Sequence, residues 1–296
     1  MSPSSHFPRV AVWAGRVALA LFVVVTLGPL WIAVKTALTP NAVLFASAGQ
    51  FLPAEPTLFN FQRVLGLVSE QDPRLARTGF ASINFLRTLL HSAIFAALVV
   101  GPQIFFSALA AYAFARLRFP GSQVLFMLFI AASMIPAAVL FIPNFILVRE
   151  LGLLNTFVGM VAPYALMTPF AVFYLRQVFL CSPRDVEEAA RIDGASFFTI
   201  FLRILLPMHR TPLTTLTILT TISAWNEFFW PFLTGRKESV QVMAVALNSF
   251  RTQQPSGSPD WTGLMACAVL GAIPMVILLV LLGRKVVESF QFSGAR

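Results

Sequence analysis

Charged side chains are scarce in this sequence. They make up 11% of its 296 residues, whereas hydrophobic residues make up 57%, and the mean hydropathy is +0.79. A typical soluble domain carries about 25% charged residues. The composition therefore excludes an ordinary soluble domain and indicates a chain whose solvent is lipid.

Cysteine is also rare, with Cys181 beside a charged loop and Cys267 inside an apolar segment. Two cysteines placed so far apart predict neither a disulfide nor a metal site. The 21 basic residues exceed the 12 acidic ones, which gives a net charge of +9, but they are scattered singly between apolar runs. Scattered basic residues indicate anionic lipid and membrane topology rather than nucleic acid.

The motifs of common enzymes are missing from the sequence. It contains no G-x-x-x-x-G-K-[ST] phosphate loop, so this chain is not expected to be an ATPase. It also lacks H-E-x-x-H and G-x-S-x-G, the patterns of zinc proteases and serine hydrolases. An enzyme is therefore the function class with the least support.

Six apolar runs dominate what is present, and each approaches or exceeds the length of about 20 residues that a helix needs to cross a bilayer. They are residues 17–34, 89–115, 124–148, 156–175, 213–233 and 264–283. Because the runs are continuous rather than alternating, they predict helices and not barrel strands. The expected fold class is all-α, a polytopic membrane protein with six transmembrane helices.

The basic residues predict the orientation. If the amino end is cytoplasmic, Arg116 and Arg118 lie in a short inner loop and Arg149 in a short outer one, which agrees with the positive-inside rule. Six crossings then place both termini in the cytoplasm.

The chain is expected to divide into three parts. Residues 1–84 hold the first transmembrane helix and an external segment, residues 85–283 form a core of five transmembrane helices, and residues 284–296 form a cytoplasmic tail. Within the external segment, residues 35–84 could fold against the outer helix ends, contact a solute-delivering protein, or serve as a connector.

A charged stretch, SPRDVEEAARIDGASFFTIFLRILLP at residues 182–207, separates the fourth and fifth apolar runs. Ser182 and the proline after it are suited to begin a helix. Gly194 is suited to end that helix in a left-handed conformation, and Ser196 to cap a second helix that stops at Pro207. The stretch therefore predicts two short helices joined at a glycine bend.

The first of these helices has a face of small residues. Four side chains fall on it at i, i+3, i+4 and i+7: Val186, Ala189, Ala190 and Asp193. Small residues let a partner surface approach closely, and the flanking carboxylates and guanidinium groups offer charge-assisted contacts. Alternatively, Glu187 and Arg191 could pair on the helix, for about 0.2–0.5 kcal/mol.

Two motifs carry a resemblance to a known family. The run Glu188-Ala189-Ala190 is followed by Gly194, Ile204 and Leu206-Pro207, and an AAYAFAR run with a phenylalanine-x-glycine turn occupies residues 110–121. The first motif resembles the cytoplasmic EAA signature of ABC importer permeases. Its form, EAARIDGAS, is similar to the carbohydrate-uptake branch that includes the maltose and glycerol-3-phosphate permeases.

This resemblance implies that the loop docks into a cleft of an ATP-hydrolysing subunit. The implied docking residues are Glu187, Glu188, Ala189, Ala190, Arg191, Asp193, Gly194, Ala195 and Pro207. The alternative for the loop is an interfacial amphipathic helix with no partner. Other implied partners are a second permease subunit, two copies of the nucleotide-binding subunit and an extracytoplasmic sugar-binding protein, all at the bacterial inner membrane. No cofactor is expected in this chain, because ATP and Mg²⁺ would bind to the partner subunits.

The fifth apolar run contains Trp225, Asn226 and Glu227, and Glu227 is the one carboxylate in the six runs. A charge facing lipid near the midplane would cost about 2.5–3.5 kcal/mol, so this carboxylate should face protein or water. One interpretation is that the tryptophans, Trp225 and Trp230, anchor an interface. The other is that Trp225, Asn226 and Glu227 line the path of a sugar.

Three function classes remain open from the sequence. The first is a permease subunit of an ATP-driven, binding-protein-dependent sugar importer. An ion-coupled secondary transporter is the second, although such proteins usually have more intramembrane ionisable groups and internal repeats. The third is a helical anchor in a larger assembly. The sequence does not identify the sugar or polyol.

Overall fold

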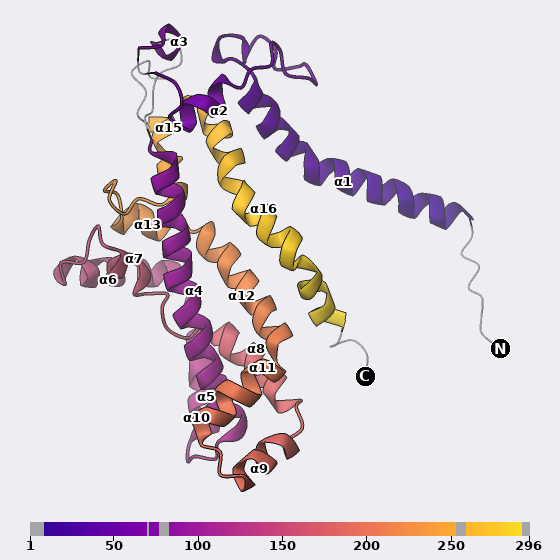
Figure 1. Ribbon diagram of the computed structural model, residues 1–296, viewed down its shortest axis with the longest axis vertical. Helices are drawn as coiled ribbons and strands as arrows, with labels where there is room; N and C mark the ends of the chain where they lie inside the picture. Colours follow the sequence, from indigo (N-terminus) through magenta and orange to yellow (C-terminus); the bar gives the residue numbers. More distant parts are fainter. Residues whose placement is uncertain (1–8, 70, 77–82, 253–258, 292–296) are drawn as a thin grey trace. The chain divides into compact units, whose positions relative to one another are not determined.

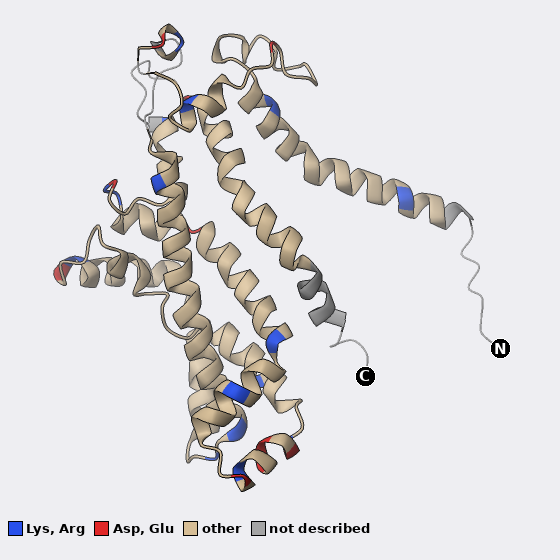
Figure 2. Ribbon diagram, viewed as in Figure 1, with Lys and Arg blue, Asp and Glu red and all other residues tan. Residues whose placement is uncertain are grey.

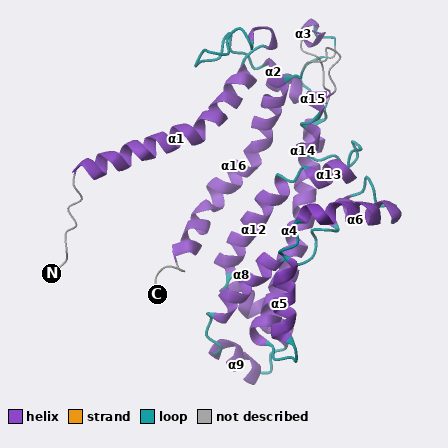
Figure 3. Cartoon of the chain, turned by 180° about the vertical axis from the view of Figure 1, so that it is seen from behind, coloured by secondary structure: helices purple, strands orange, loops and turns teal. Residues whose placement is uncertain are grey.

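The computed structural model describes residues 9–69, 71–76, 83–252 and 259–291. Every regular element in these ranges is helical, as Figure 3 shows. The expected all-α class is therefore confirmed for the described part of the chain. Residues 1–8 and 292–296, on which the expected position of the termini depends, lie outside the described residues.

Figure 1 labels most of the helices along the chain, and Figure 3 also labels α14. In order they are α1 (Arg9–Leu38), η1 (Asn41–Val43), α2 (Phe59–Val64), α3 (Pro73–Ala76), α4 (Phe85–Arg116), α5 (Ser122–Ala132), α6 (Ala137–Glu150), α7 (Phe157–Val161), α8 (Pro169–Leu180), α9 (Asp185–Ile192), α10 (Phe197–Thr199), the π-helical segment η2 (Ile200–Leu205), α11 (Leu206–Met208), α12 (Arg210–Trp225), α13 (Phe229–Thr234), α14 (Met243–Ala246), α15 (Ser249–Thr252) and α16 (Trp261–Gln291).

Three helices are long and apolar enough to cross a membrane: residues 12–38, 85–116 and 261–283. A fourth segment, α5 with α6, passes the same test only as a pair, because it bends by 92° between the two helices. Pro136 stands at this bend in an extended conformation, where its missing N–H and the steric restriction on its neighbour interrupt the helix.

The expected spans at residues 156–175 and 213–233 are not single long helices. The first is divided between α7 and α8, and Thr168 begins α8 by accepting a hydrogen bond from the Ala171 N–H at 3.4 Å. The second ends at Trp225, which makes α12 only 16 residues long. Six crossings and cytoplasmic termini therefore stay predictions.

The chain forms two compact units. Unit 1 comprises Met1–Phe85 and Leu247–Ala272, and unit 2 comprises Leu86–Ala246 and Ile273–Arg296. The division expected from the sequence, at residues 84 and 283, concerns topology rather than packing and stays a prediction.

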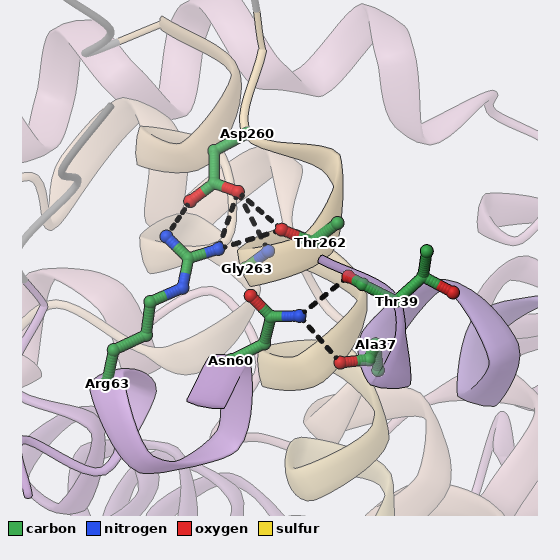
Figure 4. Close-up of polar contacts among 7 residues, drawn as sticks. All are labelled: Ala37, Thr39, Asn60, Arg63, Asp260, Thr262 and Gly263. Atoms are coloured by element: carbon green, nitrogen blue, oxygen red, sulfur yellow. Dashed lines mark hydrogen bonds and ion pairs between the residues drawn. The ribbon is translucent and has the colours of Figure 1, made fainter. Parts of the chain in front are cut away.

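In unit 1, α2 is fastened to the end of α1 by a buried amide (Figure 4). Asn60 Nδ2 donates hydrogen bonds to the carbonyl oxygens of Ala37 and Thr39, both at 2.9 Å. These carbonyls belong to the last turn of α1 and the residue that follows it, where no helical partner is available. This part of residues 35–84 therefore folds against a helix end.

A buried ion pair fastens α2 to the start of α16 as well. Arg63 donates to both carboxylate oxygens of Asp260, at 2.6 and 2.7 Å, and to the Thr262 hydroxyl at 2.9 Å. Asp260 also accepts from the Gly263 N–H at 2.9 Å, so the same carboxylate caps α16. The two side chains of the pair are 3% and 0% exposed. We call Asn60, Arg63, Asp260 and Thr262 the unit 1 polar cluster.

The core of unit 2 lies where α4 meets α8 and η2. Ala111 and Tyr112 of α4 are fully buried, together with Phe179 of α8 and Phe201 of η2. The Tyr112 ring lies 5.6 Å from the Phe201 ring. Alanines allow this close approach of helix to helix in lipid. The core therefore joins the long helix α4 to the charged stretch that follows α8.

Candidate functional site

The charged stretch at residues 182–207 forms two short helical segments, as expected, but it begins differently. The first helix, α9, starts at Asp185, and Arg184 precedes it without a side-chain cap. The expectation that Ser182 caps this helix and that Pro183 is its first residue is wrong. The Ser182 hydroxyl oxygen instead lies 3.4 Å from the Val178 carbonyl oxygen of the preceding helix and contacts His209.

The glycine bend and the second cap are confirmed. Gly194 has a φ of +80°, a left-handed conformation that glycine adopts without steric cost. The Ser196 hydroxyl accepts from the Thr199 N–H at 3.3 Å. Pro207 does not end the second helix, which continues to Met208. Because Pro207 falls in the first turn of α11, just after the π-helical turns of η2, its missing N–H is tolerated.

Helix α9 has one buried and one exposed face. Ala190 is half-buried, whereas Val186 is 48% exposed and Ile192 is 86% exposed. Ala189 and Asp193, which the sequence places on one face with Val186, are exposed too. Acidic residues gather on this short helix (Figure 2). The exposed face of α9 thus combines uncovered apolar side chains with carboxylates.

Glu187 lies on the buried face of α9 rather than the exposed one. Arg116 Nε donates to its Oε1 at 2.8 Å, and the Tyr112 hydroxyl donates to its Oε2 at 3.3 Å. Both side chains of the ion pair are 3% exposed. The pairing of Glu187 with Arg191 that the sequence allowed is replaced by this pair. Its partners lie in the AAYAFAR run, so the two motifs singled out from the sequence meet here.

Two further contacts hold the start of the stretch. Arg116 Nη2 donates to the Ser182 carbonyl at 3.0 Å. The His209 Nδ1–H donates to the Leu205 carbonyl at 2.8 Å, which leaves Nε2 to accept from the Ser182 hydroxyl. Burial lowers the pKa of His209 below its ordinary value, and the nearby Arg116 acts in the same direction. His209 is therefore neutral at pH 7.

The three residues expected to line a solute path do not converge. Glu227 lines a cavity of about 330 Å³ in unit 2. Trp225 lines a different hollow, beside Ala97 and Met275. Asn226 is exposed, and its Nδ2 donates to the Ile222 carbonyl at 2.8 Å. Only the carboxylate of the three reaches the cavity.

Glu227 also has a structural role, because its Oε1 accepts from the Trp230 N–H at the start of α13, at 3.2 Å. Trp230 itself is 1% exposed and donates from Nε1 to the Gly159 carbonyl at 3.3 Å. A tryptophan buried in protein does not anchor a lipid interface, so that interpretation is wrong for Trp230.

Sequence reasoning missed five polar residues of the cavity. Gln103 comes from α4, Tyr164 and Thr168 from the link between α7 and α8, and Thr220 and Ser223 from α12. They come from separate apolar runs, and polar residues spread over such runs carry no local signal of a shared site. The proline before Gln103 marks only a helix irregularity.

Long apolar helices, a sharply bent helix pair and a charged two-helix stretch packed on the core are features of a helical membrane protein. The chain belongs to the family of binding-protein-dependent transport system inner membrane components, whose model matches residues 103–290. Members of this family are permease subunits of ABC transporters and are not enzymes themselves.

Similar proteins cover nearly the whole chain. It is 30% identical over 279 residues to the sn-glycerol-3-phosphate transport system permease protein UgpE of Yersinia pestis, covering 94% of this chain and 95% of that one. It is 26% identical over 295 residues to the arabinooligosaccharides transport system permease protein AraQ of Bacillus subtilis, covering 98% and 99%.

A solved structure shows the same fold. It is the crystal structure of a bacterial ABC transporter involved in the import of the acidic polysaccharide alginate, and the matched chain gives a TM-score of 0.78 at 24% identity. The match covers 96% of this chain and 99% of that chain.

Proposed function

We propose that this chain is one of two permease subunits of an ATP-driven, binding-protein-dependent importer of a sugar or a closely related polyol. Family membership supports the transporter class, and the names of the relatives support the solute class. Those names cover both an oligosaccharide and a phosphorylated polyol, so they leave open whether the solute is charged. The partners would be a second permease, two nucleotide-binding subunits and an extracytoplasmic sugar-binding protein.

The observation that carries this proposal is that α9 is exposed on one face and bonded to α4 on the other. Its outer face, with Glu188 and Ile192, is uncovered and suited to dock the ATPase subunit. Its inner face is fixed to the end of α4 through Glu187 and Arg116. Breaking a buried ion pair by removing one partner costs about 3–5 kcal/mol. A push on α9 would therefore move α4 rather than slide along it.

In this mechanism the chain transmits the movement of the ATPase subunits to its membrane helices and catalyses no reaction. ATP and Mg²⁺ would bind to the partner subunits, whose closure displaces α9. Because α9, α4 and η2 share one packed core, the displacement would reach the membrane helices as a rigid movement. The six crossings, the cytoplasmic termini and the bacterial inner membrane location complete the proposal.

Copurification from native membranes tests this function. The wild-type chain is expected to bring down an ATPase subunit, and Glu188→Lys, which reverses a charge on the exposed face of α9, is expected to lose that subunit or uncouple ATP hydrolysis from uptake. Glu238→Lys is the matched control, because Glu238 is an exposed carboxylate outside this stretch. Absence of any ATPase from the wild-type preparation would contradict the proposal. Uptake that persists on an ion gradient without ATP would favour the ion-coupled transporter instead.

A further inference from the structure

The cavity of unit 2 combines aromatic and polar walls. Phe95 of α4 and Tyr164 of the α7–α8 link face each other edge to face, with ring centroids 6.3 Å apart. Phe170 of α8 adds a third ring to the lining. The volume of about 330 Å³ is at the lower end for small-molecule sites. It suits one ring-sized unit of a solute.

Gln103 presents an amide to this cavity without a protein partner. Its side chain is 9% exposed and makes no hydrogen bond to any residue in the described ranges. Buried amides in folded proteins nearly always have a hydrogen-bond partner. The Gln103 residue is mostly buried, but its amide atoms are accessible from the cavity that it lines and have no protein partner. Their hydrogen bonds are therefore left to the contents of the cavity.

The Thr220 hydroxyl, like the Gln103 amide, has no hydrogen bond to the described protein, whereas its neighbours on α12 do. The other hydroxyl side chains beyond the first turn each donate to the carbonyl four residues earlier: Thr214, Thr215, Thr217, Thr221 and Ser223. Thr220 makes no such bond among the described residues, and it lines the cavity. The Tyr164 hydroxyl is likewise without a hydrogen bond in this part of the chain. Three elements thus bring unpartnered polar groups to one cavity.

Glu227 gives the cavity its charge. No lysine, arginine or histidine is among the described residues that line it. Its Oε1 bonds to the Trp230 N–H, and no hydrogen bond within the described residues occupies Oε2. A hydroxyl group of a neutral solute could donate to this carboxylate in a charge-assisted bond. A phosphate or a carboxylate of a solute would instead meet a like charge with no compensating cation.

We propose that this cavity binds one ring of a neutral, hydroxyl-rich solute and rejects anionic ones. Gln103 and Thr220 form hydrogen bonds to its hydroxyls, the aromatic rings pack on its apolar face, and Glu227 determines the charge selectivity. This inference rests on the proposed function and deepens it, because it names the charge class of the solute.

The experiment uses the assembled transporter, purified with its native partners in lipid nanodiscs. Saturation-transfer NMR is recorded with a mixture of neutral pentoses and hexoses, and separately with a mixture of uronates and sugar phosphates. The neutral mixture is expected to give a signal that falls at least fivefold in Gln103→Leu and in Thr220→Val. Thr220→Val is nearly isosteric and serves where Gln103→Leu lowers the yield. Thr221→Val is the matched control and keeps the signal, because the Thr221 hydroxyl is bonded to the Thr217 carbonyl.

Glu227→Gln tests the selectivity. It is expected to raise the signal of the anionic mixture at least fivefold relative to that of the neutral one. Binding of the anionic mixture alone to the wild type overturns the inference. So does an unchanged neutral signal in both Gln103→Leu and Thr220→Val, and so does the absence of any signal, which would mean that water alone fills the cavity. The ATPase subunit is assayed in the same preparation, so failure of the importer assignment shows as its absence, independently of sugar binding.

Discussion

The unit 1 polar cluster is buried, and Gln103 and Thr220 of the unit 2 cavity are buried and half-buried. The two sites differ in whether their hydrogen-bonding groups have protein partners. In the cluster, Arg63, Asp260 and Thr262 bond to one another (Figure 4). Arg63 Nε is the one buried side-chain nitrogen or oxygen without a partner in the described chain. In the cavity, Gln103 and Thr220 have no bond to the described protein. A satisfied cluster fixes helix ends, whereas an unsatisfied lining is suited to a ligand.

The Glu187–Arg116 pair belongs to the satisfied kind, although it lies in the functional stretch. Its carboxylate has two donors, and its guanidinium group also reaches the Ser182 carbonyl. It therefore fastens α9 to α4. Substitutions in the unit 1 polar cluster, in the Glu187–Arg116 pair and in the unit 2 cavity should therefore distinguish residues that stabilise the fold from residues that bind a ligand.

The largest effect is expected from Asp260→Ala. This change leaves the Arg63 charge buried without its partner and removes the cap of α16, so the loss of stability should be about 3–5 kcal/mol. Thermal unfolding in detergent, followed by the fraction that stays monodisperse, measures it. Asp72→Ala is the control, because the Asp72–Arg74 pair is exposed on the Arg74 side, and it should leave the unfolding midpoint unchanged. Equal midpoints for the two variants would show that the cluster does not stabilise the fold.

Glu187→Ala should have the next largest effect, about 3 kcal/mol. The expected loss is at the lower end of that range because Arg116 keeps its bond to the Ser182 carbonyl. Hydrogen exchange of the α9 amides should become faster, and uptake should fall while the ATPase subunit still binds. Glu188 is the next residue and is exposed. Glu188→Ala should therefore weaken binding of the ATPase subunit and leave hydrogen exchange of the α9 amides unchanged. If both variants behave alike, the two faces of α9 do not have separate roles.

Gln103→Leu should behave in the opposite way to Asp260→Ala. Replacing an unpartnered amide with an apolar group of similar size removes no protein bond, so stability should stay within about 1 kcal/mol of the wild type or rise. Thermal unfolding of the solute-free protein measures this change. A loss as large as that of Asp260→Ala would mean that Gln103 is part of the fold and not of a binding surface.

Local rules predicted the bend in residues 182–207 but not the contacts that hold this stretch against α4. Gly194 and Ser196 act through their own backbone and the next turn, so their roles follow from residue type alone. The partner of Glu187 lies 71 positions away, and only the packing of α4 against the stretch brings the two together.

Trp225, Asn226 and Glu227 do not share one surface, for a geometric reason. Trp225, Asn226 and Glu227 are adjacent in sequence, but successive residues of a helix point about 100° apart. Neighbours therefore reach different surfaces, as Trp225 and Glu227 do. Gln103 and Thr220 share a cavity although they lie on different helices. Which residues share a surface therefore depends on the packing of the helices, and adjacency in the sequence does not predict it.

The smallest expected effect is a dependence of the docking stretch on pH through His209. Burial lowers the pKa of His209 in the folded protein, so the unfolded state takes up a proton at a higher pH than the folded state. Stability should be fully present above the unfolded pKa of about 6.5 and should decrease as the pH falls below it. Protonation would also reverse the hydrogen bond between Nε2 and the Ser182 hydroxyl, and it would place a second positive charge near Arg116. The difference in unfolding midpoint between pH 7.5 and pH 5.5 should therefore be smaller in His209→Gln than in the wild type. If this difference in unfolding midpoint were equal in both proteins, the titrating group would be another residue, and His209 would contribute only its hydrogen bonds to the fold.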